Sequence, residues 1–297
     1  MKKLFIILPF LVLSNSFAAS TLTKIKETGK VNMGVRESSG ALSYTIGNNQ
    51  FVGYHVEICN KALAGVQKKL AVKKLDITYH PVTSQNRIPL MTNSTIDIEC
   101  GSTTNNVARQ KDVAFAVTTF VEEVRIAVKA NSGINSISQL SGKNIATTTG
   151  TTTVQTLRKH EKAASISFNE IYGKDHSDSF LLLESGRADA FIMDGAIIAG
   201  LISKSKKPTD FKIVGDVLSV EPIAIMMRKD DVEFKKAIDE QIIAMIKSGE
   251  IAKIWDKWFM QPIPPTNTKV GLPVNANTKA AWANPNTKPM EDYVVKK

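Results

Sequence analysis

Residues 95–109, TIDIECGSTTNNVAR, place a polar loop directly after a strand, and this junction decides the class of fold. The run TIDIEC (95–100) alternates in the manner of a half-buried strand. The loop that follows carries hydroxyl groups, amides and one guanidinium group, that of Arg109. In open α/β sheets, ligands bind just outside the carboxyl ends of the strands. Two interpretations therefore stand: a surface loop, or a site for a small polar anion.

The rest of the chain repeats this succession of strands and helices. Apolar strand-like runs alternate with segments whose apolar residues have helical spacing. Expected strands are 31–36, 74–82, 95–100, 124–129, 165–172, 211–215 and 223–229, and expected helices are 55–70, 86–94, 153–160, 231–247 and 249–259. No flexible linker separates the two halves, so the pattern predicts an α/β fold of two lobes with a cleft. We expect the tail after Pro262 to be irregular, because it is rich in Pro, Asn, Thr and Lys.

Polar loops recur at the carboxyl ends of the expected strands. They contain Arg36, TSQNR (83–87), GSTTNNVAR (101–109), TTTGTT (147–152) and MDGA (193–196). These loops come from both halves of the chain, and the sheet geometry brings them to the mouth of the cleft. The sequence therefore predicts a polar ligand site there.

The first residues indicate export. MKKLFIILPFLVLSNSFAAS has two lysines, an apolar run from Leu4 to Leu13 and then small residues, the pattern of a secretory signal peptide. The run is shorter than the roughly 20 residues that span a bilayer. We expect residues 1–18 to be removed by cleavage after Ala18, and the mature protein to lie in the periplasm.

The charge of the chain, +10 at pH 7, favours anionic partners. The basic residues are spread along the sequence and form no nucleic-acid-binding motif, so we expect a basic surface and no nucleic-acid partner.

The two cysteines, Cys59 and Cys100, fall in an expected helix and at the end of an expected strand. Export allows a disulfide, but the sequence alone leaves open whether they pair. Neither lies in a CxxC or metal-ligand pattern, and we expect no metal and no cofactor.

Several blocks resemble one family. SQNRIPL (84–90), IECGSTTNNVARQ (98–110), TTTGTTTVQTL (147–157) and KDHSDSF (174–180) resemble the periplasmic glutamate/aspartate-binding proteins of amino-acid ABC transporters. The resemblance runs from about Leu22 to about Pro265. In the family a cysteine often lies in the strand after the second crossover, whereas here that strand is IAIMM, so the family's disulfide is not carried over.

This resemblance implies a type II, Venus-flytrap periplasmic binding protein, with each lobe a sheet flanked by helices. The first lobe would comprise 19–120 and 217–297, and the second 121–216. A monomer would bind L-glutamate or L-aspartate between the lobes and deliver it to an inner-membrane ABC permease.

The resemblance also implies roles for particular residues, and the chemistry of glutamate supports them. A buried amino acid with two carboxylates and one ammonium group needs cationic groups, one anion and neutral donors. Arg109 would hold the α-carboxylate with its planar fork, and Asp194 would pair with the α-ammonium. Hydroxyl groups or backbone N–H groups would come from Ser102, Thr104, Thr149, Thr151 and Thr152, and the side-chain carboxylate would be held by Arg36, Ser84, Arg87 and His176.

Simpler roles compete with these. Arg109 could form a surface salt bridge, the threonines and Asp194 could cap helices, and His176 could be a solvated loop residue. An enzyme on the same scaffold, or a ligand-presenting partner of a sensor, would share the fold. For an enzyme, His176 and Glu37 are the acid–base candidates left over, and no Ser–His–Asp or HExxH pattern is present, so we expect no enzymatic activity.

Overall fold

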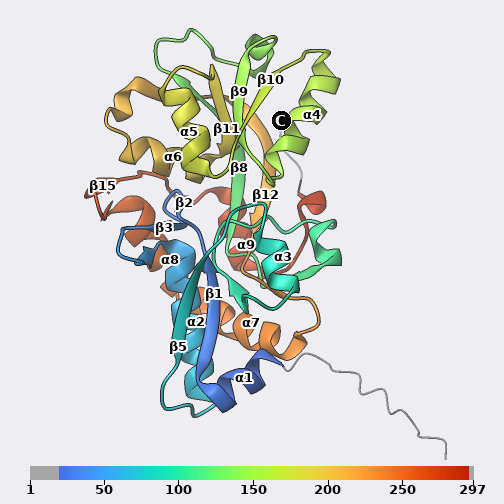
Figure 1. Cartoon of the computed structure of the whole chain (residues 1–297), viewed down its shortest axis with the longest axis vertical. Coiled ribbons are helices and arrows are strands. Elements are labelled where there is room, and N and C mark those ends of the chain that lie inside the picture. The colour runs from blue at the N-terminus through green and yellow to red at the C-terminus, as the bar shows by residue number, and fades with distance from the viewer. Residues whose placement is uncertain (1–19, 294–297) are drawn as a thin grey trace, which may run out of the picture.

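The computed structural model describes residues 20–293, so the expected signal peptide lies outside the described residues. Two lobes lie one above the other and are joined by long strands (Figure 1). The chain is a two-lobed α/β protein, as the sequence predicts. None of the helices between residues 20 and 293 combines the length and the apolar character that crossing a bilayer requires.

The first lobe is built on a five-stranded sheet. Its strands, in spatial order, are β5 (Asp76–Pro81), β1 (Lys30–Val35), β6 (Ile98–Glu99), β13 (Met226–Arg228) and β7 (Val113–Phe115). β1 runs parallel to β5 and β6, whereas β13 is antiparallel to β6 and β7. The lobe's helices are α1 (Thr21–Thr28), α2 (Tyr54–Lys69), α3 (Arg87–Thr92), α7 (Val232–Lys247) and α8 (Glu250–Trp255). A small sheet of β2 (Ser38–Ser39), β3 (Ser43–Thr45) and β4 (Phe51–Val52) lies between β1 and α2 in sequence.

The second lobe has its own five-stranded sheet. Its spatial order is β10 (Asn169–Gly173), β9 (Asn144–Thr148), β11 (Ala190–Asp194), β8 (Phe120–Lys129) and β12 (Phe211–Ile223). Its helices are α4 (Thr153–Ala164), α5 (His176–Glu184) and α6 (Gly195–Lys204). Short 3-10 turns occur at η1 (Arg109–Lys111), η2 (Ile137–Leu140), η3 (Pro208–Asp210) and η5 (Met290–Asp292), and a π-helical turn at η4 (Asp256–Met260).

β8 and β12 are the antiparallel strands that connect the lobes. Their pairing runs from Phe211↔Lys129 to Ile223↔Phe120, with an irregularity between Val214 and Ser219. The sequence predicts a strand at 211–215 and a separate one at 223–229, and this division is wrong. β12 runs through the segment 216–222 and pairs with β8 again from Ser219 to Ile223, beyond the irregularity, and a new strand begins at Met226.

The prediction of an irregular tail after Pro262 is wrong for part of that segment. After the hairpin of β14 (Pro262–Ile263) and β15 (Thr268–Lys269), the chain forms α9 (Ala276–Ala283). Asn275 starts this helix by accepting a hydrogen bond from the Thr278 N–H at 2.7 Å. The amide of Asn275 and the indole of Trp282 donate to the carbonyls of Val121 and Thr119. Contacts with β8, which local composition does not encode, therefore order the tail.

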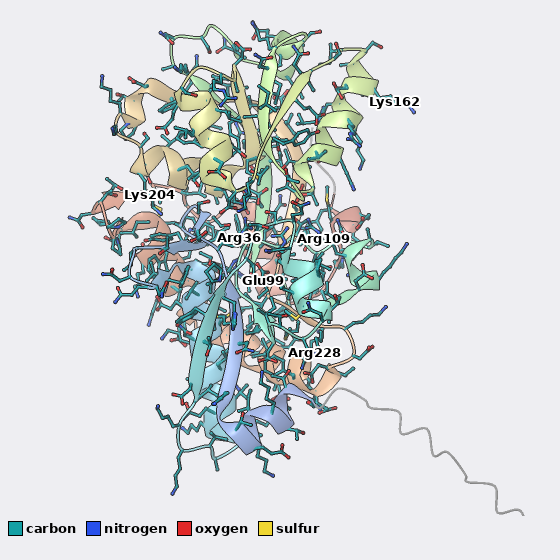
Figure 2. All side chains as sticks on the ribbon, viewed as in Figure 1. Arg36, Glu99, Arg109, Lys162, Lys204 and Arg228 are labelled. Atoms are coloured by element: carbon teal, nitrogen blue, oxygen red, sulfur yellow. A yellow bond between two sulfur atoms is a disulfide. The ribbon has the colours of Figure 1, made fainter. Side chains whose placement is uncertain are left out.

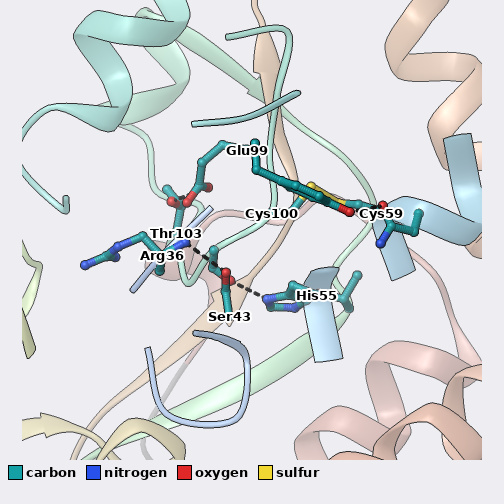
Figure 3. Close-up of a disulfide and its surroundings, with 11 residues drawn as sticks. Arg36, Ser43, His55, Cys59, Glu99, Cys100 and Thr103 are labelled. Atoms are coloured by element: carbon teal, nitrogen blue, oxygen red, sulfur yellow. Dashed lines mark hydrogen bonds between the residues drawn. A yellow bond between two sulfur atoms is a disulfide. The ribbon is translucent and has the colours of Figure 1, made fainter. Parts of the chain in front are cut away.

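The two cysteines form a disulfide, which settles the question that the sequence left open. Cys59 on α2 and Cys100 after β6 have Cα atoms 6.3 Å apart. Both side chains are buried in the core of the first lobe. Figure 3 shows the bond close to the segment that carries Glu99 and Thr103. The disulfide therefore ties α2 to the strand that leads into the polar loop.

Candidate functional site

One cavity collects most of the residues that the sequence singles out. It is a small cavity between the lobes, with a volume of about 10 Å³. Its lining is Ser84, Arg87, Ser102, Thr104, Thr151, Thr152, His176, Met193 and Asp194. Of the other predicted residues, Arg36 and Arg109 do not line the cavity but contact residues that do, Ser102 and Thr104 respectively. Thr149 is not part of the lining, and its N–H donates to the Gly173 carbonyl at 3.1 Å.

The loop 101–106 presents alternate side chains to the cavity. Ser102 and Thr104 line it, whereas the hydroxyl of Thr103 turns away and donates to the buried carboxylate of Glu99 at 2.7 Å. This is the period of two that an extended segment imposes. Gly101 leaves room for the Glu99 carboxylate, because a Cβ there would lie 2.0 Å from Oε1 of Glu99.

Three polar groups at the cavity have no protein partner. Oγ of Ser84, Nε of Arg87 and Nε2 of His176 are buried without a hydrogen-bond partner among residues 20–293. Arg87 is the first residue of α3 in the first lobe, and His176 is the first residue of α5 in the second. A hydroxyl, a guanidinium N–H and an imidazole nitrogen share one cavity, and the imidazole nitrogen donates when the Thr148 hydroxyl donates to the other ring nitrogen. In that tautomer the three groups form a set of donors suited to a carboxylate.

Burial lowers the pKa values of His176 and Arg87. Burial, followed by the Arg36 charge, lowers the pKa of His176 to about 3, so the ring is neutral at physiological pH. Its Nδ1 lies 3.0 Å from the hydroxyl of Thr148, which fixes the ring orientation. Burial and the nearby Arg109 charge lower the pKa of Arg87 well below its usual range. A guanidinium group stays charged in proteins, so the lowered pKa measures the cost of burying this cation, and a bound anion would relieve that cost.

Arg109 reaches both lobes. Its Nη1 donates to the Thr104 carbonyl at 2.9 Å, and its Nη2 donates to the Gly150 carbonyl of the second lobe at 3.3 Å. A surface salt bridge, the competing interpretation, is not what the structure shows, since both partners are carbonyls. Figure 2 shows Arg36 and Arg109 at the level where the lobes meet.

Asp194 ends β11 and precedes α6. Its side chain makes no capping hydrogen bond to this helix, whose Ala196 N–H donates instead to the buried carboxylate of Glu122 at 3.3 Å. Burial, followed by the carboxylate of Glu221, raises the pKa of Asp194 to about 7. An ammonium group beside it would lower that pKa again, so the carboxyl group is suited to a cationic partner.

Sequence reasoning missed two further acids at the site. Oε2 of Glu221, on β12, accepts hydrogen bonds from Thr104 at 2.7 Å and from Thr152 at 2.6 Å, which belong to different lobes. Asp175, which precedes α5, forms an ion pair with Arg36. A carboxylate inside the apolar run LSVEPI was the available signal for Glu221, because burying an unpartnered charge is costly. Met193 gave no signal beyond its place at a strand end.

The family model for bacterial extracellular solute-binding proteins, family 3, matches residues 31–261. The chain belongs to this family. The chain is 44% identical over 271 residues to the glutamate/aspartate import solute-binding protein of Escherichia coli (strain K12), covering 91% of this chain and 90% of that protein. It is 43% identical over 273 residues to the L-glutamate/L-aspartate-binding protein of Pseudomonas aeruginosa, with the same coverage.

Solved structures share the fold. An ancestral arginine-binding protein bound to glutamine superimposes with a TM-score of 0.68 at 28% identity, over 78% of this chain and 98% of that one. The relatives are import or binding proteins, and this solute-binding protein is accordingly not an enzyme. Glu37, an acid–base candidate in the sequence, is exposed and does not line the cavity.

Proposed function

We propose that this solute-binding protein takes up L-glutamate or L-aspartate between its lobes, as a monomer in the periplasm, and delivers it to an inner-membrane ABC permease. The observation that carries the proposal is the set of unpartnered donors on Ser84, Arg87 and His176. They share a cavity with one acid, Asp194. An acidic amino acid would supply the carboxylate that the donors lack and the ammonium that the acid lacks.

The roles divide along the contacts already described. Arg109, beside Thr104 and the Gly150 carbonyl, binds the α-carboxylate, and Asp194 binds the α-ammonium. Arg36 and Arg87 converge on Ser102, at 3.4 Å to its hydroxyl and 3.2 Å to its carbonyl, and bind the side-chain carboxylate together with Ser84 and His176. Thr151 and Thr152 lie where α4 begins, and this helix end favours an anion. The similarity to two glutamate/aspartate-binding proteins supports the same assignment.

Calorimetric titration of refolded, ligand-free protein with a panel of amino acids tests this. We expect glutamate and aspartate to bind, and glutamine to bind at least about a hundredfold more weakly, because its amide leaves a buried cation unpaired. Arg109→Ala should weaken both acids by about 3–5 kcal/mol, since a buried charge loses its partner. Equal affinities for glutamine and glutamate would overturn the assignment of the acidic side chain.

A further inference from the structure

An ion pair joins the two lobes beside the cavity. Arg36 follows β1 in the first lobe, and Asp175 precedes α5 in the second. Nη2 of Arg36 pairs with Oδ1 of Asp175. The arginine side chain is fully buried, and 14% of the aspartate side chain is exposed. Because the partners belong to different lobes, separation of the lobes breaks this pair.

The carboxylate of Asp175 is held by a second residue of the first lobe. Its Oδ2 accepts a hydrogen bond from the hydroxyl of Ser38 at 2.7 Å. That hydroxyl oxygen accepts in turn from the Ser177 N–H of α5 at 3.1 Å. Ser38 and Arg36 lie two residues apart, so both donors reach the N-terminal end of α5 from one short segment.

Asp175 does not line the cavity, so it acts on the ligand through Arg36. The other terminal nitrogen of Arg36, Nη1, lies 3.4 Å from the hydroxyl of Ser102, which does line the cavity. The backbone N–H of Arg36 donates to Ser43 at 2.9 Å, which fixes the start of the side chain (Figure 3). Because one terminal nitrogen pairs with Asp175 and the other contacts Ser102, the guanidinium group is held beside the wall of the cavity.

The adjoining hairpin of β2 and β3 contacts the second lobe again. Nζ of Lys204, on α6, donates to the Gly40 carbonyl at 2.9 Å and lies 3.1 Å from the centre of the Tyr44 ring. None of these residues lines the cavity. Gly40 and Tyr44 therefore carry a contact between the lobes that is separate from the ligand's own contacts.

We propose that Asp175 is a positioning residue for Arg36 and fastens the closed lobes, so that it slows release of the acidic ligand. The inference rests on the proposed function, in which Arg36 acts on the ligand's carboxylate. The ligand enters and leaves through the open form, and a contact made only in the closed form lowers the rate of opening. Its loss therefore raises the dissociation rate and leaves the association rate nearly unchanged.

Asp175→Asn tests the proposal without removing the helix cap, because asparagine caps a helix as well as aspartate does. We expect the dissociation constants for glutamate and for aspartate to rise by the same factor, about tenfold or more, in calorimetry. In stopped-flow measurements the dissociation rate should rise by this factor, while the association rate should stay nearly unchanged. In Ser38→Ala the dissociation constants and the dissociation rate should also rise, but by a smaller factor.

Asp178→Asn is the matched control. Asp178 lies in the same first turn of α5, is exposed and carries the same charge, and asparagine keeps a side-chain oxygen to accept the hydrogen bond that Asp178 takes from the Asp175 N–H at 3.2 Å. This variant should keep the wild-type rates. An unchanged dissociation rate in Asp175→Asn, or an equal increase in Asp178→Asn, would overturn the proposal.

Failure of the proposed function would show separately, as wild-type protein that binds neither acid. The ion pair is then tested in ligand-free protein by small-angle X-ray scattering. Asp175→Asn should have a larger radius of gyration than the wild type and than Asp178→Asn. Equal radii would refute the role of Asp175 in closure.

Discussion

At the scale of single residues, the site is a set of charges buried before any ligand is considered. Arg36 is fully buried but has Asp175, whereas Arg87 is 2% exposed and its side chain has one hydrogen bond among residues 20–293, to the Ser102 carbonyl. A carbonyl stabilises a buried cation much less than a carboxylate does. Arg87 is therefore the group with the most to gain from an anionic ligand.

Asp194 makes binding depend on pH. Its pKa of about 7 in the closed, ligand-free protein means that it is largely protonated in mild acid. An ammonium ligand needs the ionised form, so binding releases a proton. The dissociation constant for glutamate should rise about tenfold for each pH unit below about 7 and be flat just above it. His176 does not titrate in this range, since its pKa is about 3.

Calorimetry in two buffers of different ionisation enthalpy measures the released proton directly. Glu221→Gln offers the comparison, because it removes the second cause of the raised pKa of Asp194. The midpoint of the pH dependence should then move to lower pH. An affinity that is constant from about pH 8 to about pH 5 would contradict this account.

At the scale of elements, the site is formed by the ends of strands and the starts of helices. β6, β9 and β11 end at the cavity, and α3, α4, α5 and α6 begin there. Helix starts supply free N–H groups and the positive end of the helix dipole, which suits a ligand with two carboxylates. The same arrangement requires the elements to be fixed relative to one another, and in the first lobe the disulfide contributes to this.

Loss of the disulfide should lower stability and leave affinity unchanged. Cys59 and Cys100 lie 41 residues apart, and a closed loop of this length corresponds to about 3–4 kcal/mol in the free energy of unfolding. Urea denaturation of the Cys59→Ser/Cys100→Ser variant measures the loss, and glutamate titration of the same variant checks the site. A loss below about 1 kcal/mol, or a strong fall in affinity, would contradict the prediction.

At the scale of the whole molecule, close backbone contacts seal the closed lobes. A Cβ added to Gly150 would lie 2.8 Å from the Gln85 backbone of the other lobe. One added to Gly200, on α6, would lie 2.6 Å from Cα of Gly40. β8 and β12 cross between the lobes as continuous strands, so opening is a bend of these strands that separates the glycine contacts.

Gly200→Ala should hold the lobes apart. Gly200 lies within α6 and alanine favours a helix, so folding stability should be unchanged or rise by about 0.5–1 kcal/mol. The methyl group cannot fit against Gly40 when the lobes close, so glutamate affinity should fall by about tenfold or more. Scattering should show less compaction on adding glutamate than in the wild type.

Gly65→Ala is the control for a helical glycine away from the cleft. Gly65 lies on α2, and the atoms nearest to an added Cβ belong to the long side chain of Gln241. Its effect on affinity should be small. If Gly200→Ala bound glutamate as the wild type does, with full compaction, the glycine contact would have no part in closure.

The sequence by itself determined the features that arise between near neighbours in the chain. The alternation of strand-like and helix-like segments predicts the two α/β lobes, and polar residues at the ends of strands predict the site. Both predictions follow from local backbone geometry. In the loop 101–106 the same local geometry puts Ser102 and Thr104 on the cavity side, whereas Thr103 contacts Glu99. The family resemblance added which residues would act on which group of the ligand, and these roles remain predictions.

Only the tertiary structure decided how distant residues pair. Arg36 and Asp175 are 139 residues apart, and Glu221 is 117 from Thr104. No local pattern identifies the partners of these acids, because the partners are set by how two sheets and two crossing strands bring the chain together. The disulfide, the ordered α9 and the continuity of β12 were decided in the same way. Each depends on contacts that form only when the lobes have folded, and not on the conformational preferences of neighbouring residues.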